Sequence, residues 1–350
     1  MTRRYLFILL LVGSVVCACG VTEPPPTPKN PDATETQPAD TDNGAVMRLD
    51  SRLDVIVPTD AYIEKIADGF MFTEGPLWIQ TESRLLFSDV RGNTIYQWSE
   101  GDGSSDFLDP VFDGDRTGLA MISSNGLTLD SEGRVVICEH GNRVVSRLES
   151  DGTRTTLVGS YEGRRLNSPN DAVYGSDGSL YFTDPSYGLE GNEASPLREL
   201  DFNGIFRLNP DGELQLLSRD QSRPNGIALS PDETILYSAN SDPDAKVWMA
   251  YDLGPDGASN ARVFYDVTDQ TTGGLPDGMK VDTAGNVFGT GPGGVWIFAP
   301  DGTHLGTIMP DEVPANVGWG DDGHTLYMTA QTGIYRIRLT TSGQIPGPTN

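Results

Sequence analysis

The sequence predicts an all-β protein, a six-bladed β-propeller. Two observations lead to this prediction: a motif that recurs six times, and turn-forming residues between short apolar runs. The chain has 350 residues, of which 41 are Gly and 24 are Pro, and this composition is typical of many short strands joined by tight turns. No stretch of the sequence keeps the 3.6-residue period of an amphipathic helix.

The recurring unit begins with Asn, Asp or Glu, continues through a short alternating run, and turns at a Gly- or Asp-containing corner into a second apolar run. The leading residues are Glu74, Asn125, Asn170, Asn225, Asp277 and Asn316. They are 51, 45, 55, 52 and 39 residues apart, and one blade of four strands needs roughly 40 to 50 residues. We therefore assign six blades to residues 51–340, and expect a strand at Leu53–Val57 to close the ring by joining the last blade.

Residues 1–18 have the pattern of a bacterial lipoprotein signal peptide. Arg3 and Arg4 precede an apolar run that is too short to span a bilayer comfortably. The run ends in Ala18-Cys19-Gly20, which resembles a lipoprotein cleavage site with Cys19 as the lipidated residue. We predict a periplasm-facing lipoprotein of the bacterial cell envelope, at the outer membrane. A plain cleaved secretory peptide is the alternative.

Two further segments are predicted to be disordered. Residues 19–50 are rich in Pro, Thr and Asp, with too few apolar side chains to fold, and would form a tether. Residues 341–350 would form a tail. Cys138 follows an apolar run, which indicates a buried strand residue without a disulfide partner rather than a catalytic thiol.

The formal net charge of −26 excludes nucleic acid as a partner, because its phosphates would be repelled. Membrane contact is expected only through the N-terminal lipid, and the sequence indicates no obligate protein partner. The chain also lacks the Gly-x-Ser-x-Gly motif of an α/β-hydrolase. A soluble protein that handles a neutral or cationic small molecule fits these observations.

In a propeller the first strand of each blade lines the central channel, so the six leading residues should form a ring around it. Every leading side chain carries an oxygen, and Glu74 and Asp277 are carboxylates. Such a set suits one hard divalent cation, Ca²⁺ first, with Mg²⁺, Mn²⁺ or Zn²⁺ as alternatives. A single Asn-Gly or Asp-Gly pair would be ordinary turn chemistry, but the recurrence in each repeat favours a metal site.

Five short motifs follow one another along the predicted blades. They are Glu74-Gly-Pro-Leu-Trp78, Asn167-Ser-Pro-Asn-Asp171, Thr183-Asp-Pro-Ser-Tyr-Gly188, Pro224-Asn-Gly226 and Pro276-Asp-Gly-Met279. Together they resemble the gluconolactonase branch of the senescence-marker-protein/gluconolactonase/regucalcin superfamily. The ordered set spans about Phe72 to Leu339, although each motif alone is common.

The resemblance implies a six-bladed propeller with one catalytic divalent metal. By position it implies Glu74, Asn225 and Asp277 as metal ligands, and Asn170 as either a metal ligand or a residue that orients substrate. Regucalcin-type members carry an Arg before the Asn-Asp pair. This chain has Ser168-Pro169 there, so that sugar contact is not carried over.

Asp277 is our candidate catalytic residue, as general base or nucleophile, and its alternative role is that of a ligand only. The candidate substrate-binding residues are Asn125, His140, Asn170 and Tyr187. Asn125 follows from the repeat, and Tyr187 can reach the channel mouth. His140 should follow the second strand of its blade, where a surface or packing role is the alternative.

These observations predict metal-dependent hydrolysis of sugar lactones, with D-glucono-1,5-lactone as the favoured substrate. The metal would act as a Lewis acid and acidify a bound water. Another lactonase or a phosphotriesterase on the same scaffold is one alternative, because a fold does not fix the substrate. A non-catalytic propeller whose metal only holds the blades or binds a partner is the other.

Overall fold

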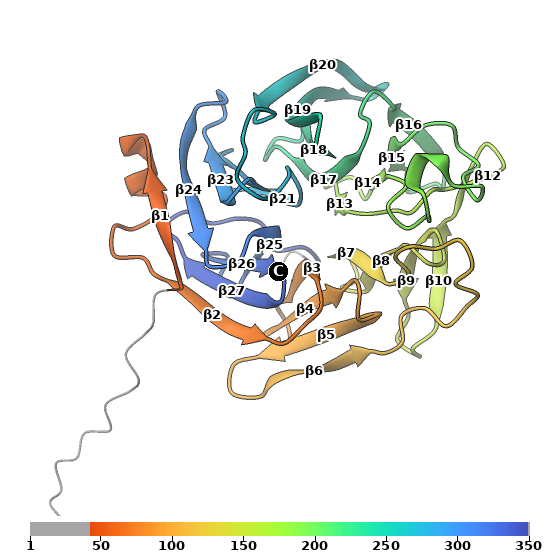
Figure 1. Ribbon diagram of the computed structural model, residues 1–350, viewed down its shortest axis with the longest axis horizontal. Coiled ribbons are helices and arrows are strands. Elements are labelled where there is room, and N and C mark those ends of the chain that lie inside the picture. Colours follow the sequence, from red (N-terminus) through yellow and green to blue (C-terminus); the bar gives the residue numbers. More distant parts are fainter. Residues whose placement is uncertain (1–42, 349–350) are drawn as a thin grey trace, which may run out of the picture. The chain divides into compact units, whose positions relative to one another are not determined.

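The computed structural model describes residues 43–348, so the predicted signal peptide, Cys19 and most of the predicted tether lie outside the described residues. The described part confirms the predicted six-bladed β-propeller. Six antiparallel sheets are arranged around a common axis (Figure 1). Within these residues no helix is long and apolar enough to cross a membrane.

Blades 1 to 4 are meanders of four strands, numbered from the channel outwards. Blade 1 contains β3 (Thr73–Ile79), β4 (Arg84–Asp89), β5 (Thr94–Ser99) and β6 (Gly103–Leu108). Blade 2 contains β7 (Ser124–Leu129), β8 (Val135–Glu139), β9 (Val144–Leu148) and β10 (Arg154–Val158). Blade 3 contains β13 (Ala172–Tyr174), β14 (Leu180–Asp184), β15 (Gly204–Leu208) and β16 (Leu214–Ser218). Blade 4 contains β17 (Pro224–Leu229), β18 (Ile235–Asp242), β19 (Ala245–Gly254) and β20 (Gly257–Asp266).

The last two blades include strands from the N-terminal side of the chain. Blade 5 contains β21 (Met279–Val281), β22 (Val287–Gly291), β23 (Gly294–Phe298) and β24 (His304–Pro310), with β1 (Gly44–Arg48) on its outer edge. Blade 6 contains β25 (Pro314–Gly320), β26 (Thr325–Ala330) and β27 (Gly333–Arg338), and β2 (Ile63–Asp68) is its fourth strand. A hairpin of β11 (Ser160–Tyr161) and β12 (Arg164–Arg165) and two 3-10 helices, η1 (Ser51–Val55) and η2 (Asn192–Ala194), complete the described elements.

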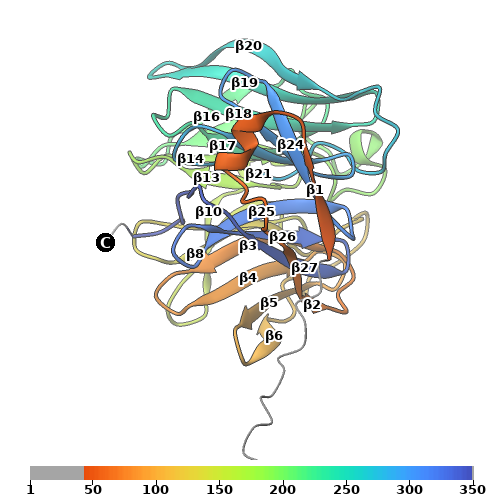
Figure 2. The same cartoon turned by 90° about the vertical axis from the view of Figure 1, so that its left-hand side faces the viewer.

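The ring is closed by a different segment from the predicted one. Strand β2 pairs with β27, so that Ile63 lies opposite Ile337, and this joins the two ends of the described chain in one sheet. The predicted strand at Leu53–Val57 is wrong, because residues 51–55 form η1 with Leu53 fully buried. A short apolar run cannot be assigned to strand or helix by periodicity alone. Figure 2 shows β1 lying along β24, with η1 beside it.

Both ends of the domain extend further than predicted. Residues 44–48, assigned to the tether, form β1. Residues 341–348, assigned to the disordered tail, contact the propeller: Gly343 forms a β-bridge with Asp282, and its N–H donates to the carbonyl of Gly323 at 3.0 Å. Ile345 packs against the core. These short segments lack a period of their own, and the sheet edges that they cover decide their conformation.

The hydrophobic core consists of six clusters, one between each pair of neighbouring blades. Trp78 of blade 1, for example, stacks on Tyr327 of blade 6 with ring centroids 5.3 Å apart. Cys138 is buried in β8 without a disulfide partner among the described residues, as predicted. Because packing occurs between blades, the channel side of the inner strands is left to polar side chains.

Candidate active site

The six leading residues lie where the inner strands begin, and contacts between neighbours connect all six blades. Asn316 Nδ2 donates to Glu74 Oε2 at 3.0 Å, across the junction between blades 6 and 1. The N–H of Gly126, next to Asn125, donates to the carbonyl of Asn170 at 2.7 Å. Asn170 Nδ2 in turn donates to Asn225 Oδ1. The predicted ring of oxygen-bearing side chains is therefore present at the channel.

The backbone turns the leading side chains toward the channel by a repeated irregularity. The register between the first and second strands shifts next to the leading residue in four blades, between Glu74 and Leu77 in blade 1 for example. Such bulges re-aim a side chain and are frequent beside active sites. Because the same shift recurs at the same place in these four blades, the alignment of their leading residues is a property of the inner strand.

The glycine that follows four of the leading residues is required by close packing between inner strands. At Gly226 a Cβ would overlap the carbonyl oxygen of Asp277, and at Gly278 it would overlap the side chain of Asn316. The turn-chemistry explanation of these Asn-Gly and Asp-Gly pairs is therefore wrong. Gly is used there because the neighbouring blade approaches the backbone.

Replacing Gly226 by Ala is expected to destabilise the protein by about 1–3 kcal/mol, since the added methyl group forces two inner strands apart. The shift also moves Asp277, so lactone hydrolysis should fall with stability. Gly254→Ala in the same blade is the matched control, because nothing lies within 4 Å of its Cβ position. Urea denaturation of both variants checks this. Equal free energies of unfolding for Gly226→Ala and Gly254→Ala would contradict the close approach of the neighbouring strand at Gly226.

Three carboxylates, those of Glu74, Asp171 and Asp277, lie close enough to interact electrostatically. Glu74 and Asp171 are 1% and 2% exposed, and Asp277 is half-buried. Burial raises the pKa of Glu74 to about 7, and the negative charge of Asp171 adds to this effect. Burial, together with the charges of Glu74 and Asp171, raises the pKa of Asp277 well above its ordinary value. The positive charge of Lys280 lowers the pKa values of Glu74 and Asp171, but only partly offsets the effect of burial.

A divalent cation fits this site. Oδ1 of Asp277 and Oδ1 of Asn125 are buried and have no hydrogen-bond partner within residues 43–348. The same residues contain no group of three or more His, Cys, Asp and Glu side chains arranged to hold a metal. A cation here would therefore be bound by amide oxygens as well as by Glu74 and Asp277, a mixed oxygen set that Ca²⁺ accepts.

A buried polar chain positions the two central asparagines. His140 is fully buried, and its Nε2 lies 3.2 Å from Asn170 Oδ1. Burial lowers the pKa of His140 to about 4, so the ring is neutral at pH 7. Asn225 Nδ2 donates to Ser241 Oγ at 2.8 Å. His140 thus holds Asn170, and Ser241 holds Asn225.

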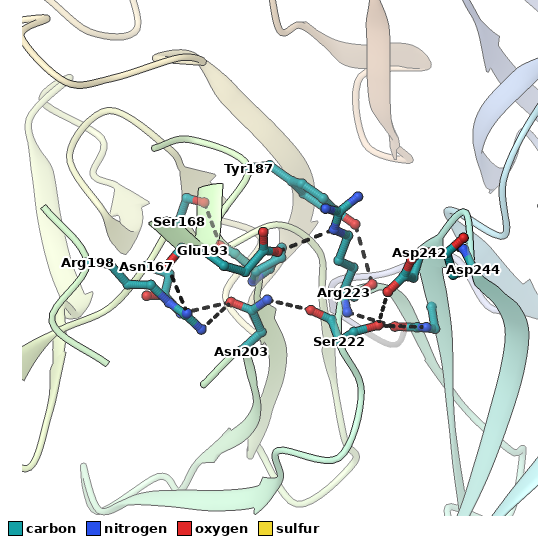
Figure 3. A network of polar contacts seen from close by, with 12 residues as sticks. Asn167, Ser168, Tyr187, Glu193, Arg198, Asn203, Ser222, Arg223, Asp242 and Asp244 are labelled. Atoms are coloured by element: carbon teal, nitrogen blue, oxygen red, sulfur yellow. Dashed lines mark hydrogen bonds and ion pairs between the residues drawn. The ribbon is translucent and has the colours of Figure 1, made fainter. Parts of the chain in front are cut away.

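Tyr187 is half-buried and contacts the residue that precedes β17. Its hydroxyl donates to the carbonyl of Arg223 at 3.4 Å (Figure 3). Burial raises the pKa of Tyr187, and the charge of Asp277 adds to this, whereas hydrogen bonding to Ser241 opposes it. The hydroxyl thus contacts the segment that leads into β17, close to Ser241, which holds Asn225.

The structure brings all the predicted site residues of the propeller together, but their roles stay predictions. The alternative of a surface histidine is wrong for His140, which packs inside blade 2 against Asn170. The amide oxygen of Asn170 faces His140, so the structure shows an orienting contact for this residue. Sequence reasoning missed Asp171 and Ser241. The sequence does distinguish Asp171, because this residue stands where Gly follows the leading residue in four other blades.

Comparisons with known proteins agree with this geometry. A family model described as the SMP-30/Gluconolactonase/LRE-like region matches residues 72–332. A gluconolactonase from Zymomonas mobilis is 38% identical over 312 residues, which are 86% of this chain and 87% of that protein. A pentonolactonase from Haloferax volcanii is 28% identical over 268 residues, 74% of this chain and 81% of that protein. The solved structure of a gluconolactonase from Xanthomonas campestris has a TM-score of 0.75 and 30% identity, with 87% of this chain and 99% of that chain covered.

Proposed function

Because the chain belongs to the SMP-30/gluconolactonase/LRE-like family, we propose that it is a hydrolase of sugar lactones, with D-glucono-1,5-lactone as its substrate. The names of the similar proteins support lactone hydrolysis as the reaction. The arrangement of the channel supports a metal-dependent route. The observation that carries this proposal is the cluster of Glu74, Asp171 and Asp277, in which Oδ1 of Asp277 is buried without a hydrogen-bond partner among the described residues. The charge of Lys280 only partly offsets the negative charge of this cluster.

Hydrolysis of a lactone adds water across the acyl C–O bond of a cyclic ester. Glu74, Asn225 and Asp277, with Asn125 or Asn170, would hold one divalent cation, Ca²⁺ by our choice, which polarises the lactone carbonyl and acidifies water. Asp277 would accept the proton of the attacking water while the acyl C–O bond breaks and the ring oxygen leaves as a hydroxyl group. Alternatively, Asp277 would attack the carbonyl carbon, break the same C–O bond and form an anhydride that water then hydrolyses. Its unpartnered Oδ1 is available for this contact.

The neighbouring residues keep this geometry fixed. Asn170 is held by His140 and donates to Asn225, so both amides stay in one orientation while the substrate enters. Since His140 is neutral at pH 7, it positions Asn170 without adding charge to the site. Tyr187 offers a hydroxyl at the channel mouth for a hydroxyl group of the sugar.

The substrate is tested by the initial rate of acid release from glucono-1,5-lactone by the full chain with Ca²⁺, against the spontaneous rate. A phosphotriester is assayed in parallel. We expect rapid hydrolysis of the lactone and little of the triester. A folded, Ca²⁺-loaded protein that hydrolyses only the triester, or neither compound, would overturn the substrate assignment.

We also propose that the enzyme faces the periplasm, anchored to the outer membrane through lipid on Cys19. The signal-like pattern of residues 1–18 and the following cysteine support this. Replacing Cys19 by Ala is expected to move the protein from the membrane fraction to the soluble fraction of the cell envelope. An unchanged distribution of the variant would contradict lipidation at this residue.

A further inference from the structure

The channel rim beside blade 4 carries an arginine that the proposed chemistry does not use. Arg223 directly precedes β17 and lies two residues before Asn225. The equivalent position in blade 3, two residues before Asn170, is Ser168. At this position of the rim, blade 4 therefore carries a guanidinium group, whereas blade 3 carries only a hydroxyl group.

The backbone of Arg223 is fixed independently of its side chain. Its N–H donates to Asn240 Oδ1 at 2.8 Å, and its carbonyl accepts from the N–H of Ser241 at 3.0 Å. The hydroxyl of Tyr187 donates to the same carbonyl. Ser241 also accepts a hydrogen bond from Asn225 Nδ2 at 2.8 Å and donates one to the carbonyl of Pro276, the residue before Asp277. The backbone of Arg223 is therefore connected through Ser241 to the segment that carries the catalytic candidate.

The guanidinium group of Arg223 has N–H donors that form no hydrogen bond within the described residues. Its Nε lies 3.3 Å from Glu193 Oε1 in η2 (Figure 3), and in the described part of the chain neither Nη atom has a hydrogen-bond partner. The side chains of Arg223 and Glu193 are 31% and 40% exposed. The pair thus presents free N–H donors beside a carboxylate acceptor, an arrangement that matches neighbouring hydroxyl groups of a sugar.

Arg223 and Glu193 border a pocket of about 490 Å³ between the β14–β15 connection and the start of β17. This volume falls within the range of small-molecule sites. Its lining contains Arg198, Arg219 and Arg223 against four carboxylates, among them Asp220 and Asp242. The positive charge is therefore cancelled, which disfavours an anionic ligand and favours a neutral, hydrogen-bonding one.

We propose that Arg223, paired with Glu193, binds the ring hydroxyl groups of the lactone and makes the enzyme specific for neutral polyhydroxylated lactones. This inference rests on the proposed function and names the part of the same site that selects the substrate. Arg223 determines specificity and takes no part in bond making or breaking.

The test compares glucono-1,5-lactone with δ-valerolactone, which has the same ring but no hydroxyl groups. Replacing Arg223 by Gln is expected to raise KM for gluconolactone about 10- to 100-fold, the effect of losing charged hydrogen bonds, and to leave kcat unchanged. Kinetics with δ-valerolactone should not change. Arg223→Lys should give an intermediate KM, since it keeps the charge but not the planar fork.

Arg262→Gln is the matched control. Arg262 belongs to the same blade, pairs with Asp252 at 2.7 Å and is 40% exposed, but lies on the outer strand β20. It should behave as wild type with both lactones. An Arg223→Gln variant that loses activity equally on both lactones, or keeps its KM for gluconolactone, would refute the proposal. A wild type that prefers 6-phosphoglucono-1,5-lactone to gluconolactone would do so too.

A binding measurement separates this inference from the proposed function. 1,5-Anhydro-D-glucitol carries ring hydroxyl groups but no carbonyl, so calorimetry reports hydroxyl recognition without catalysis. We expect it to bind the wild type and Arg262→Gln, and to bind Arg223→Gln about 10-fold more weakly or worse. If the wild type hydrolyses no lactone yet shows this pattern, only the proposed reaction fails. Equal binding by wild type and Arg223→Gln means that the inference fails.

Discussion

Replacing Asp277 by Asn is expected to lower kcat for gluconolactone by about 10²- to 10⁴-fold, the contribution of a general base, while the metal-free protein becomes more stable. The amide cannot accept the water's proton or attack the carbonyl. The substitution also removes one negative charge from a cluster in which the carboxylates of Asp277, Glu74 and Asp171 repel one another. Rates under saturating Ca²⁺ and thermal unfolding with chelator measure the two effects separately.

Asp282→Asn is the control for this experiment, because Asp282 is a buried carboxylate of the same blade with a different environment. It is 1% exposed and accepts hydrogen bonds from Ala284, Asn286 and Thr341. Its replacement should cost about 1–3 kcal/mol of stability and leave activity intact. If Asp277→Asn instead loses stability and keeps its rate, Asp277 is a structural residue and the proposed catalytic role is wrong.

Removing divalent cations with a chelator is expected to abolish lactone hydrolysis and to lower the unfolding temperature. A cation that binds only the folded state at a concentration a thousandfold above its Kd contributes about 4 kcal/mol of stability. Adding Ca²⁺ back should restore both properties. Full activity in a protein shown by elemental analysis to be metal-free would exclude the metal-dependent route.

The metal-free protein should also lose stability as the pH rises. Burial raises the pKa of Glu74 from 4.5 to about 7 in the folded state. The folded state therefore binds the proton more tightly than the unfolded state, so this contribution is fully present below pH 4.5 and is lost as the pH rises through 7. Glu74→Gln should remove this part of the pH dependence, and saturating Ca²⁺ should mask it.

Other buried groups act in the same pH range and set the baseline for that comparison. The pKa of Asp184 is raised to about 7 by burial, and its contribution has the same sign as that of Glu74. The pKa of His140 is lowered to about 4, so its contribution is lost as the pH falls from 6.5. Both remain in Glu74→Gln, so the difference between variant and wild type reports Glu74 together with the effect of its charge on Asp277. Identical pH profiles of the two proteins would contradict the shifted pKa.

The six repeats were sufficient to predict the propeller and its channel residues. Each repeat keeps an oxygen-bearing residue at the start of its first strand, and the propeller turns that sequence periodicity into a ring in space. The repeats give no prediction for β1, η1 and β2, because these elements precede the first repeat. Leu53 is apolar in either a strand or a 3-10 helix, and only its packing against blades 5 and 6 distinguishes them.

The parts of the site that sequence reasoning missed depend on contacts between blades. Asp171 occupies the position of a repeated Gly, but its interaction with Glu74 follows only from closure of the ring. Ser241 lies near the end of β18 and reaches Asn225 because β17 and β18 of the same blade pair there. The pairing of Arg223 with Glu193 depends on η2, which lies in the long connection between β14 and β15 and brings Glu193 to the rim.

The central claim is that one divalent cation, held by the ring of buried oxygens, is required for lactone hydrolysis. Its most direct test is a titration of the metal-free protein with Ca²⁺, in which bound metal and gluconolactone hydrolysis are measured on the same samples. We predict that activity rises in proportion to occupancy and saturates at one cation per chain, and that Asp277→Asn shows much weaker binding. Activity that is independent of occupancy, or unaltered binding in Asp277→Asn, would contradict the account.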